Sequence, residues 1–427
     1  MVYISDILAR QILDSRGNPT LEVDVKLSDG SLGRAAVPSG ASTGEYEAYE
    51  LRDNNLKLFN GKSVLKAIEN INVEIFNTFS GRNPYQQRII DRDLIDLDDT
   101  ANKNKLGANA ILGFSMAVAR AAAKSQNLPL WKYIGGMRAN ILPIPMMNII
   151  NGGAHANNGL DFQECMIMPI GFTKFSDALR SGVEIFYNLK KLLSKKGFSV
   201  AVGDEGGFAP DINSLEEALS YISESVENSG YKLGEEIFIS IDAAASELYK
   251  KGFYHLTGEN KKLNSDELFK YWEGICKKFP IVSIEDPFDE NDWDGFKELT
   301  KVLGDKLQVV GDDLFVTNKE RLLKGIKQNS GNAILIKLNQ IGTLSETLET
   351  IELAKNYSFG VIISHRSGET EDVFISDLSV AINAGQIKTG SLSRSDRTAK
   401  YNQLLRIEES LGDNAHYFGR DFFNSNN

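Results

Sequence analysis

The sequence has few cysteines and no long apolar run, and both shortages limit what the protein can be. Only two cysteines, Cys165 and Cys276, occur in 427 residues, without a CxxC or zinc-type spacing. Each lies in an apolar segment, so we expect two buried free thiols and a reducing compartment. The longest apolar stretch, ILPIPMMNII, is short and contains two prolines, so no membrane span is expected.

The N-terminal stretch MVYISDILARQILDSRG lacks the continuous apolar core of a signal peptide, which predicts a cytoplasmic protein. A secondary cell-surface or secreted pool would leave no mark in this pattern. Basic residues are also scarce, at 47 against 58 acidic ones, for a net charge of −11. Because no basic cluster offsets this balance, we do not expect a nucleic-acid partner.

The length and composition predict a soluble protein with more than one domain. The chain is 42% hydrophobic and 25% charged, which is ordinary for a globular protein. At 427 residues it is too long for one small core, so two domains are expected, one of them a large barrel.

The first 37 residues predict an antiparallel β-meander. Apolar and polar residues alternate from Leu21 to Leu27, as in a half-buried strand, and Asp29-Gly30 is a strong hairpin signal. Residues 38–44 (PSGASTG) are small, and they predict either a surface loop or a mobile lid whose hydroxyls reach a ligand or metal. Helix-like segments follow near 62–78, 84–97 and 106–126, the last apolar enough to be buried.

Repeated βα units are predicted from about residue 143 onward. Seven apolar runs each end in ionisable groups, and successive ends lie 23 to 43 residues apart. In a βα-barrel the carboxyl ends of the strands build the active site. The run ends carry Asp204 and Glu205, Asp242, Glu285 and Asp286, Asp312 and Asp313, Lys337, His365 and Arg366, and Lys388.

Each predicted helix start follows one of these strand ends in the sequence, as βα units require. A Ser or Thr precedes a Glu by three residues at Ser214, Thr317 and Thr343, which fits the capping box. Gly135-Gly136 and two nearby prolines mark a domain boundary. We therefore expect an N-terminal α+β domain at 1–137 that carries the lid, and a C-terminal catalytic βα-barrel at 138–427.

Three of these carboxylates, Asp242, Glu285 and Asp312, predict a metal site if they converge. Without a counter-charge they would raise one another's pKa values, and a hard divalent cation removes that conflict. An all-oxygen set favours Mg²⁺ or Mn²⁺. The alternative is a set of salt bridges with nearby Lys and Arg residues.

Lys337, inside the apolar run NAILIKLNQIG, is a candidate base. A neighbouring dication and Lys388 would disfavour its charged form, whereas carboxylates alone would hold it protonated. Arg366 could bind a phosphate together with Ser367, and Glu205 could protonate a leaving hydroxyl. These residues suggest β-elimination of water from a small phosphorylated hydroxy acid. Glu164 interrupts another apolar run, where an unpaired carboxylate is rare.

Long motifs spread over the whole chain resemble the enolase family. They include SRGNPTLEVDV, SGASTGEYEAYELRD, NGGAHANN, DFQECMIMP, GDEGGFAP, SIEDPF, GDDLFVTN, LIKLNQIGTLSE, ISHRSGETED and IKTGSLSRSDRTAKYNQLLRIEE. The segment GSLSRSDR resembles bacterial members. Two departures lie in Cys165, where many relatives have phenylalanine, and in Asp98-Asp99-Thr100, where Asp-Gly-Thr is usual.

The resemblance implies an α/β fold in which an enolase-type, TIM-like barrel beginning ββαα follows a three-stranded meander with helices. It also implies a glycolytic lyase, phosphopyruvate hydratase, that reversibly dehydrates 2-phospho-D-glycerate to phosphoenolpyruvate. Lys337 would abstract the C2 proton, Glu205 would protonate the C3 hydroxyl, and Glu164 would support Glu205.

The resemblance further implies two Mg²⁺ ions and a set of substrate contacts. The conformational ion would bind Asp242, Glu285 and Asp312, and Ser42 of the lid would join the catalytic ion. Contacts to substrate would come from His155, Gln163, Glu164, Lys337, His365, Arg366, Ser367 and Lys388.

Family members are homo-oligomers, either dimers or octamers built from dimers. Two rivals remain: another superfamily member such as a sugar-acid dehydratase or racemase, and a non-catalytic protein that kept the fold. The lid and the phosphate-binding motifs argue against the first, and the presence of Lys337 with every metal carboxylate argues against the second.

Overall fold

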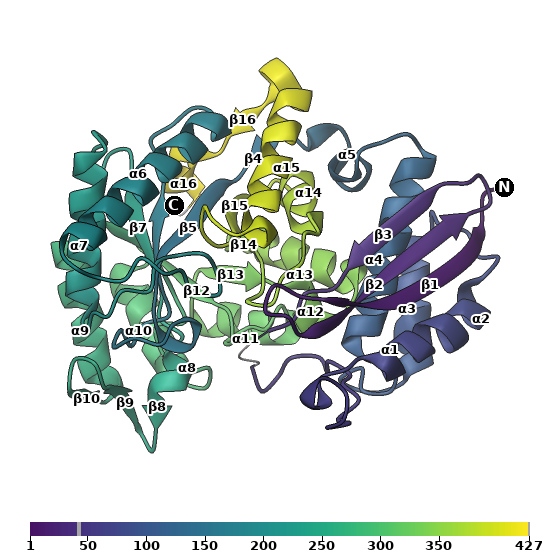
Figure 1. Cartoon of the computed structure of the whole chain (residues 1–427), viewed down its shortest axis with the longest axis horizontal. Coiled ribbons are helices and arrows are strands. Elements are labelled where there is room, and N and C mark those ends of the chain that lie inside the picture. The colour runs from purple at the N-terminus through teal and green to yellow at the C-terminus, as the bar shows by residue number, and fades with distance from the viewer. Residues whose placement is uncertain (41–43, 426–427) are drawn as a thin grey trace.

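The computed structural model describes residues 1–40 and 44–425. In Figure 1 the N-terminal part, coloured purple to blue, lies at one end of the molecule, and a barrel coloured teal to yellow makes up the rest. None of the helices within the described residues is long and apolar enough to cross a bilayer.

The N-terminal part is built on the predicted three-stranded antiparallel meander. Its strands are β1 (Ile4–Leu13), β2 (Pro19–Leu27) and β3 (Leu32–Ala36), in the order β1-β2-β3. Leu21, Val23 and Val25 are fully buried, as the alternation predicts, and Gly30 takes a positive φ of 89° in the hairpin.

Helices cover one face of this sheet. The long helix α4 (Ala108–Ser125) packs on β2 and β3 and is buried on nearly all sides. The predicted helical segments are confirmed, although the first is divided by a π-helical turn. The other helices of this part are α1 (Leu65–Asn70), α2 (Phe76–Phe79), α3 (Gln87–Asp98) and α5 (Leu130–Gly135).

Eight strands close into the barrel. Strand β6 is antiparallel to both β5 and β7, and the remaining pairs are parallel. The short β5–β6 connection allows the antiparallel pair, because a parallel pair needs a crossover. In closed order the strands are β11 (Ile281–Glu285), β12 (Gln308–Gly311), β13 (Ala333–Ile336), β14 (Gly360–Ser364), β15 (Gly385–Lys388), β5 (Ile144–Asn151), β6 (Glu164–Met168) and β7 (Phe238–Asp242).

The barrel helices follow in the order that the resemblance implies, since two strands and two helices precede β7. They are α6 (Phe175–Lys195), α7 (Leu215–Asn228), α9 (Ser265–Lys278), α10 (Trp293–Leu303), α11 (Lys319–Gln328), α13 (Leu344–Asn356), α14 (Phe374–Ala381) and α15 (Ser395–Leu411), with the short α8 (Ala245–Leu248), α12 (Leu338–Ile341) and α16 (Phe422–Ser425). Two small sheets complete the fold: β8 (Tyr249–Lys250), β9 (Phe253–Leu256) and β10 (Lys261–Leu263), and β4 (Ile141–Leu142) with β16 (His416–Tyr417).

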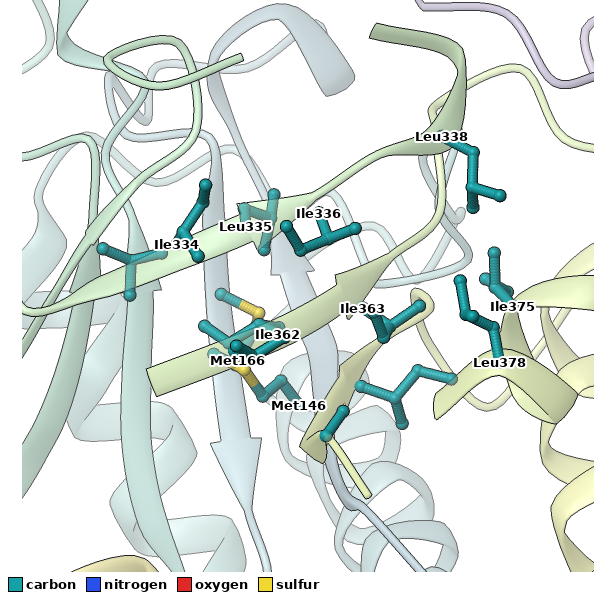
Figure 2. Packing of buried hydrophobic residues seen from close by; sticks show 14 of the residues in the cluster. Met146, Met166, Ile334, Leu335, Ile336, Leu338, Ile362, Ile363, Ile375 and Leu378 are labelled. Carbon is teal, nitrogen blue, oxygen red and sulfur yellow. The ribbon is translucent and has the colours of Figure 1, made fainter. Parts of the chain in front are cut away.

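Figure 2 shows part of the buried cluster inside and around the barrel. Apolar residues of β13 and β14, such as Ile334 and Ile362, share it with Met146 of β5 and Met166 of β6. Both cysteines are free thiols: Cys165 is buried in β6, but Cys276 of α9 is only partly buried. Burial raises the pKa of the Cys165 thiol to about 12.

One predicted strand is wrong. The run 198–207 (FSVAVGDEGG) forms no barrel strand; it lies in the loop between α6 and α7 and makes only isolated bridges. A Cβ at Gly203 would lie 2.7 Å from the His155 carbonyl oxygen, and a Cβ at Gly207 would lie 2.9 Å from the Asn148 carbonyl oxygen. The glycines therefore let this loop lie close against the end of β5, where it places Glu205 without entering the sheet.

A polar network joins the two parts of the chain. The Asp91 carboxylate of α3 accepts hydrogen bonds from Ser115 of α4 and from the backbone and hydroxyl of Ser345 at the start of α13. Arg120 of α4 pairs with Asp372, which also accepts a bond from the Ala36 backbone. The buried Asp91 and the partly buried pair of Arg120 and Asp372 are thus hydrogen-bonded across this interface.

We predict that Gly33→Ala destabilises the sheet–helix packing by at least about 2 kcal/mol, because a Cβ there would overlap backbone atoms of Ala117 and Ala121 in α4. Urea unfolding followed by circular dichroism measures the change. The matched control is Gly274→Ala inside α9, where a Cβ has nothing within 4 Å. Better helix propensity should make that variant about 0.5–1 kcal/mol more stable. Equal effects of the two substitutions would contradict the packing argument.

Candidate active site

The predicted site residues among the described ones converge at one end of the barrel, where the parallel strands end and the antiparallel β6 begins with Glu164. Glu285 ends β11 beside them, and Ser42 lies outside the described residues. One pocket is lined by the other predicted residues: His155, Gln163, Glu164, Glu205, Asp242, Asp312, Lys337, His365, Arg366, Ser367 and Lys388. Asp286, Asp313 and Ser364 also line it.

Lys388 holds three carboxylates together at the end of β15. Its Nζ lies 2.7 Å from Asp242 Oδ2, 2.9 Å from both oxygens of Glu285 and 3.1 Å from Glu164 Oε1. All four side chains are buried. Asp242 and Glu285 are direct neighbours in the β7–β11 register, which brings their carboxylates to the same ammonium.

The charges in this group shift one another's pKa values. Burial and the other carboxylates raise the pKa values of Glu164 and Glu285 well above their usual range, although Lys388 opposes the shift. Burial alone would lower the pKa of Lys388, but the surrounding carboxylates outweigh it and raise that pKa. One ammonium thus compensates three carboxylates only in part.

Lys337 directly follows β13; its side chain is partly buried, and its partner is a carboxylate. Its ammonium pairs with Asp312, whose other oxygen accepts a hydrogen bond of 2.9 Å from Gln340. Burial lowers the pKa of Lys337, but the charges of the surrounding carboxylates, that of Asp312 first and that of Glu285 after it, together outweigh burial and raise that pKa. In this arrangement Lys337 is protonated, which is the outcome expected for carboxylates acting without a dication.

The backbone of Lys337 is fixed by Thr317. The Thr317 hydroxyl accepts a hydrogen bond of 2.9 Å from the Lys337 N–H and donates one of 2.8 Å to Gln340. The sequence pattern predicted Thr317 as a helix cap, but Asn318 caps α11 instead. The predicted caps at Ser214 and Thr343 are confirmed, since each side chain accepts the predicted backbone N–H.

Two groups of side chains could hold a metal ion among the described residues. In each group the ligand atoms lie within 4.8 Å of one another. The groups are His155 with Glu164 and Glu205, and Asp286 with Asp312 and Asp313. The predicted trio of Asp242, Glu285 and Asp312 is instead divided between the two lysines, with Lys388 on the first two and Lys337 on the third.

Glu205, on the loop between α6 and α7, lies close to Asn148, His155 and His365. Asn148 of β5 donates to Glu205 Oε2 at 3.1 Å. Glu205 Oε1 lies 3.3 Å from His365 Nε2 and 3.6 Å from His155 Nδ1. Burial raises the pKa of Glu205, but the electrostatic interactions around it, with the imidazoles of His155 and His365 and with the cations Arg397 and Lys388, together outweigh burial and bring that pKa well below its usual range.

Glu164 and Glu205 therefore have pKa values displaced in opposite directions. Burial and the Glu205 charge raise that of Glu164, and His155 lies between the two, 3.8 Å from Glu164 Oε1. The environment thus favours the protonated form of Glu164 and the ionised form of Glu205. A proton shared within this pair is available to a group bound in the pocket.

Arg366, the predicted phosphate-binding residue, is paired with the N-terminal part of the chain. Its guanidinium contacts both oxygens of Glu47, at 2.9 and 3.1 Å, and donates to Asn339 at 3.0 Å. Glu47 follows the predicted lid segment. An anion that binds Arg366 must therefore compete with a carboxylate of the other domain.

Several polar residues of the site were not predicted. Asn148 carried a usable signal, since it interrupts an apolar run just as Glu164 does. Glu47 and Arg397 carried none, because their partners lie 319 and 32 residues away in sequence.

Comparison with protein families gives two matches that together cover nearly the whole chain. Residues 4–134 match the enolase N-terminal domain. Residues 139–426 match the enolase C-terminal TIM barrel domain.

We predict that Lys388→Met destabilises the fold by about 3–5 kcal/mol at pH 8, because three buried carboxylates lose their ammonium. The loss should shrink toward pH 5.5. Carboxyls whose pKa values are raised in the folded state bind protons more readily there, so falling pH favours folding. Thermal and urea unfolding at both pH values measure this.

The control for this prediction is Lys301→Met, whose side chain is 69% exposed and pairs with Glu298. We expect a change below about 0.5 kcal/mol there at either pH. A Lys388→Met variant as stable as this control would contradict the assigned charge balance.

Proposed function

Because the chain belongs to the enolase family and is accordingly a hydro-lyase of the phosphopyruvate hydratase class, we propose that its substrate pair is 2-phospho-D-glycerate and phosphoenolpyruvate and that it requires Mg²⁺. The observation that supports this most directly is the placement of Lys337, Glu205 and Arg366 around one pocket. The reaction needs a base, an acid and a phosphate-binding group at such a place.

The donor set of the pocket fits hard divalent cations. The ammonium of Lys388 occupies a position that favours a cation, since oxygens of three carboxylates lie within 3.1 Å of it. In addition, Glu164 Oε2 is buried without a hydrogen-bond partner among the described residues. We propose that Asp242, Glu285 and Asp312 hold the first Mg²⁺ and that Ser42 joins the second. When bound, the ions would compensate the negative charge that develops on the substrate carboxylate.

Lys337 would remove the C2 proton. To accept this proton, the Nζ atom of Lys337 must first be neutral. In the structure the pairing with Asp312 favours the protonated ammonium instead. Asp312 is therefore the residue whose other contacts decide whether Lys337 acts as a base. The C2–H electron pair would then form the C2–C3 double bond as the C3–O bond breaks.

Glu205 would deliver the proton with which the C3 hydroxyl leaves as water. Its proton would come from the pair it forms with Glu164, bridged by His155. Arg366 and Ser367 would bind the phosphate, and Lys388 would face the substrate carboxylate. Gln163, which donates to Asp242 at 3.1 Å, and His365 would complete the substrate contacts.

The wider biological setting is part of the same proposal. We propose a glycolytic and gluconeogenic enzyme of the cytoplasm that works as a homo-oligomer, a dimer or an octamer of dimers. We also retain the division into a lid-bearing domain at 1–137 and a catalytic barrel at 138–427.

The first test is the ultraviolet absorbance of phosphoenolpyruvate formed from 2-phosphoglycerate. We expect activity that needs Mg²⁺, is abolished by chelator, and falls by about 10²–10⁴ in Lys337→Ala. The exposed Lys306→Ala variant should keep full activity. Activity that survives in Lys337→Ala would remove the base assignment, and a folded, Mg²⁺-supplied wild type without product would favour a non-catalytic role.

The second test addresses the metal ligands. We expect Glu285→Gln, which removes a charge at nearly constant shape, to weaken Mg²⁺ binding at least tenfold in calorimetric titrations. The exposed Glu298→Gln variant serves as the matched control and should bind as the wild type does. Unchanged affinity in Glu285→Gln would exclude that carboxylate as a ligand.

A further inference from the structure

A buried arginine that the proposed reaction does not use lies directly behind the site. Arg397, in the first turn of α15, has a fully buried side chain. Its Nη1 donates to the Arg366 carbonyl at 2.7 Å, and its Nη2 donates to the carbonyls of Ser367 at 2.7 Å and Asp204 at 3.3 Å. One guanidinium thus ties the loop that carries the phosphate-binding residues to the loop that carries Glu205.

The surroundings of Arg397 are shaped to fit it. Gly390 has a φ of 79°, and a Cβ there would lie 2.7 Å from Arg397 Cδ and 2.9 Å from the Glu205 carbonyl. Ser391 N donates to that same carbonyl at 2.8 Å. Asp396 lies 2.7 Å from Arg397 Nε and balances its charge. The close packing leaves the guanidinium little freedom to turn away.

The remaining contact of Arg397 has a chemical consequence. Its Nη1 meets Nδ1 of His365. Arginine carries only donors and keeps its proton in proteins, so Nδ1 must be the acceptor. The one proton of a neutral imidazole then resides on Nε2, which is the nitrogen that lies 3.3 Å from Glu205 Oε1.

A doubly protonated His365 does not suit this position. Its Nδ1–H would point at a guanidinium, and three cations, Arg397, Lys388 and Lys337, act on it against the single facing carboxylate of Glu205. Burial, with these cations, holds the pKa of His365 well below its usual range. The ring therefore stays neutral at physiological pH.

We propose that Arg397 is a positioning residue that fixes His365 as the neutral Nε2–H tautomer and thereby provides Glu205 with a permanent hydrogen-bond donor. The catalytic meaning of this inference rests on the proposed role of Glu205. Once Glu205 has given its proton to the leaving hydroxyl, the His365 N–H stabilises the carboxylate that remains. Asn148 donates to Oε2 of the same carboxylate, and His155 Nδ1 lies 3.6 Å from its Oε1.

The direct test is ¹⁵N NMR of the full chain labelled at histidine, without substrate. The sequence has four histidines, and the signal lost in His365→Asn identifies His365. We expect an unprotonated Nδ1, a protonated Nε2, and no titration of this ring between pH 6 and 8.5. A protonated Nδ1, or a ring that titrates near its usual pKa, would overturn the proposal whether or not the protein dehydrates 2-phosphoglycerate.

Variants then test whether Arg397 is responsible. In Arg397→Met we expect the fixed tautomer to be lost, His365 to protonate at higher pH because a cation has been removed, and kcat to fall at least tenfold. Arg397→Lys, which keeps one donor, should recover part of both. Arg406→Met on the same helix, an exposed arginine bonded only to Gln403 among the described contacts, should change neither.

A folded Arg397→Met protein with unchanged His365 signals would overturn the proposal. If that variant does not fold, the tautomer found in the wild type and in Arg397→Lys decides the matter. If the tautomer is as expected but 2-phosphoglycerate is not converted, the proposed function fails and the positioning role of Arg397 stands.

Discussion

The structure depends on charged side chains that compensate one another at one end of the barrel, where they are shielded from water. Carboxylates in or just after β6, β7, β11 and β12 lie within a few ångströms of the cations that end or follow β13 and β15, and all but Lys337 are buried. An isolated buried charge costs several kcal/mol, so each group is held only because its neighbours compensate it. The compensation is incomplete around Lys388, and that deficit of positive charge supports the proposal that the pocket binds cations.

The same constraint explains why the supporting residues matter as much as the reactive ones. Thr317 and Gln340 orient Lys337 and Asp312, while Asp286 accepts the backbone N–H groups of Asp312 and Asp313 at the end of β12. Arg397 likewise holds the loops around Glu205 by donating to the carbonyls of Arg366 and Asp204. A group whose rotamer is fixed keeps its charge at the distance that the balance requires.

The sequence predicts those parts of the fold that local pattern determines. The alternation of apolar and polar residues identified β2. Ionisable groups at the ends of apolar runs identified most barrel strands, because a charged side chain is tolerated on a buried barrel strand only at the end of the barrel. The run 198–207 was misassigned because its glycines serve a close approach to β5, a long-range packing fact. Thr317 matched a capping pattern, yet burial turned its hydroxyl toward Lys337 and Gln340. Glu47 and Arg397 act through distant partners that composition and spacing do not encode.

The pairing of Glu47 with Arg366 has a thermodynamic consequence that reaches beyond the pocket. If an anion takes the guanidinium from Glu47, residues 44–48 lose one of their contacts with the barrel, so anion binding and the docking of these residues are linked, and the linkage is reciprocal. A change that stabilises the docking of these residues on the barrel in the anion-free protein must weaken anion binding by the same free energy. A sequence change at a neighbour of residues 44–48, such as Asn291 beside Tyr46, can in this way tune the affinity of a site that it never touches.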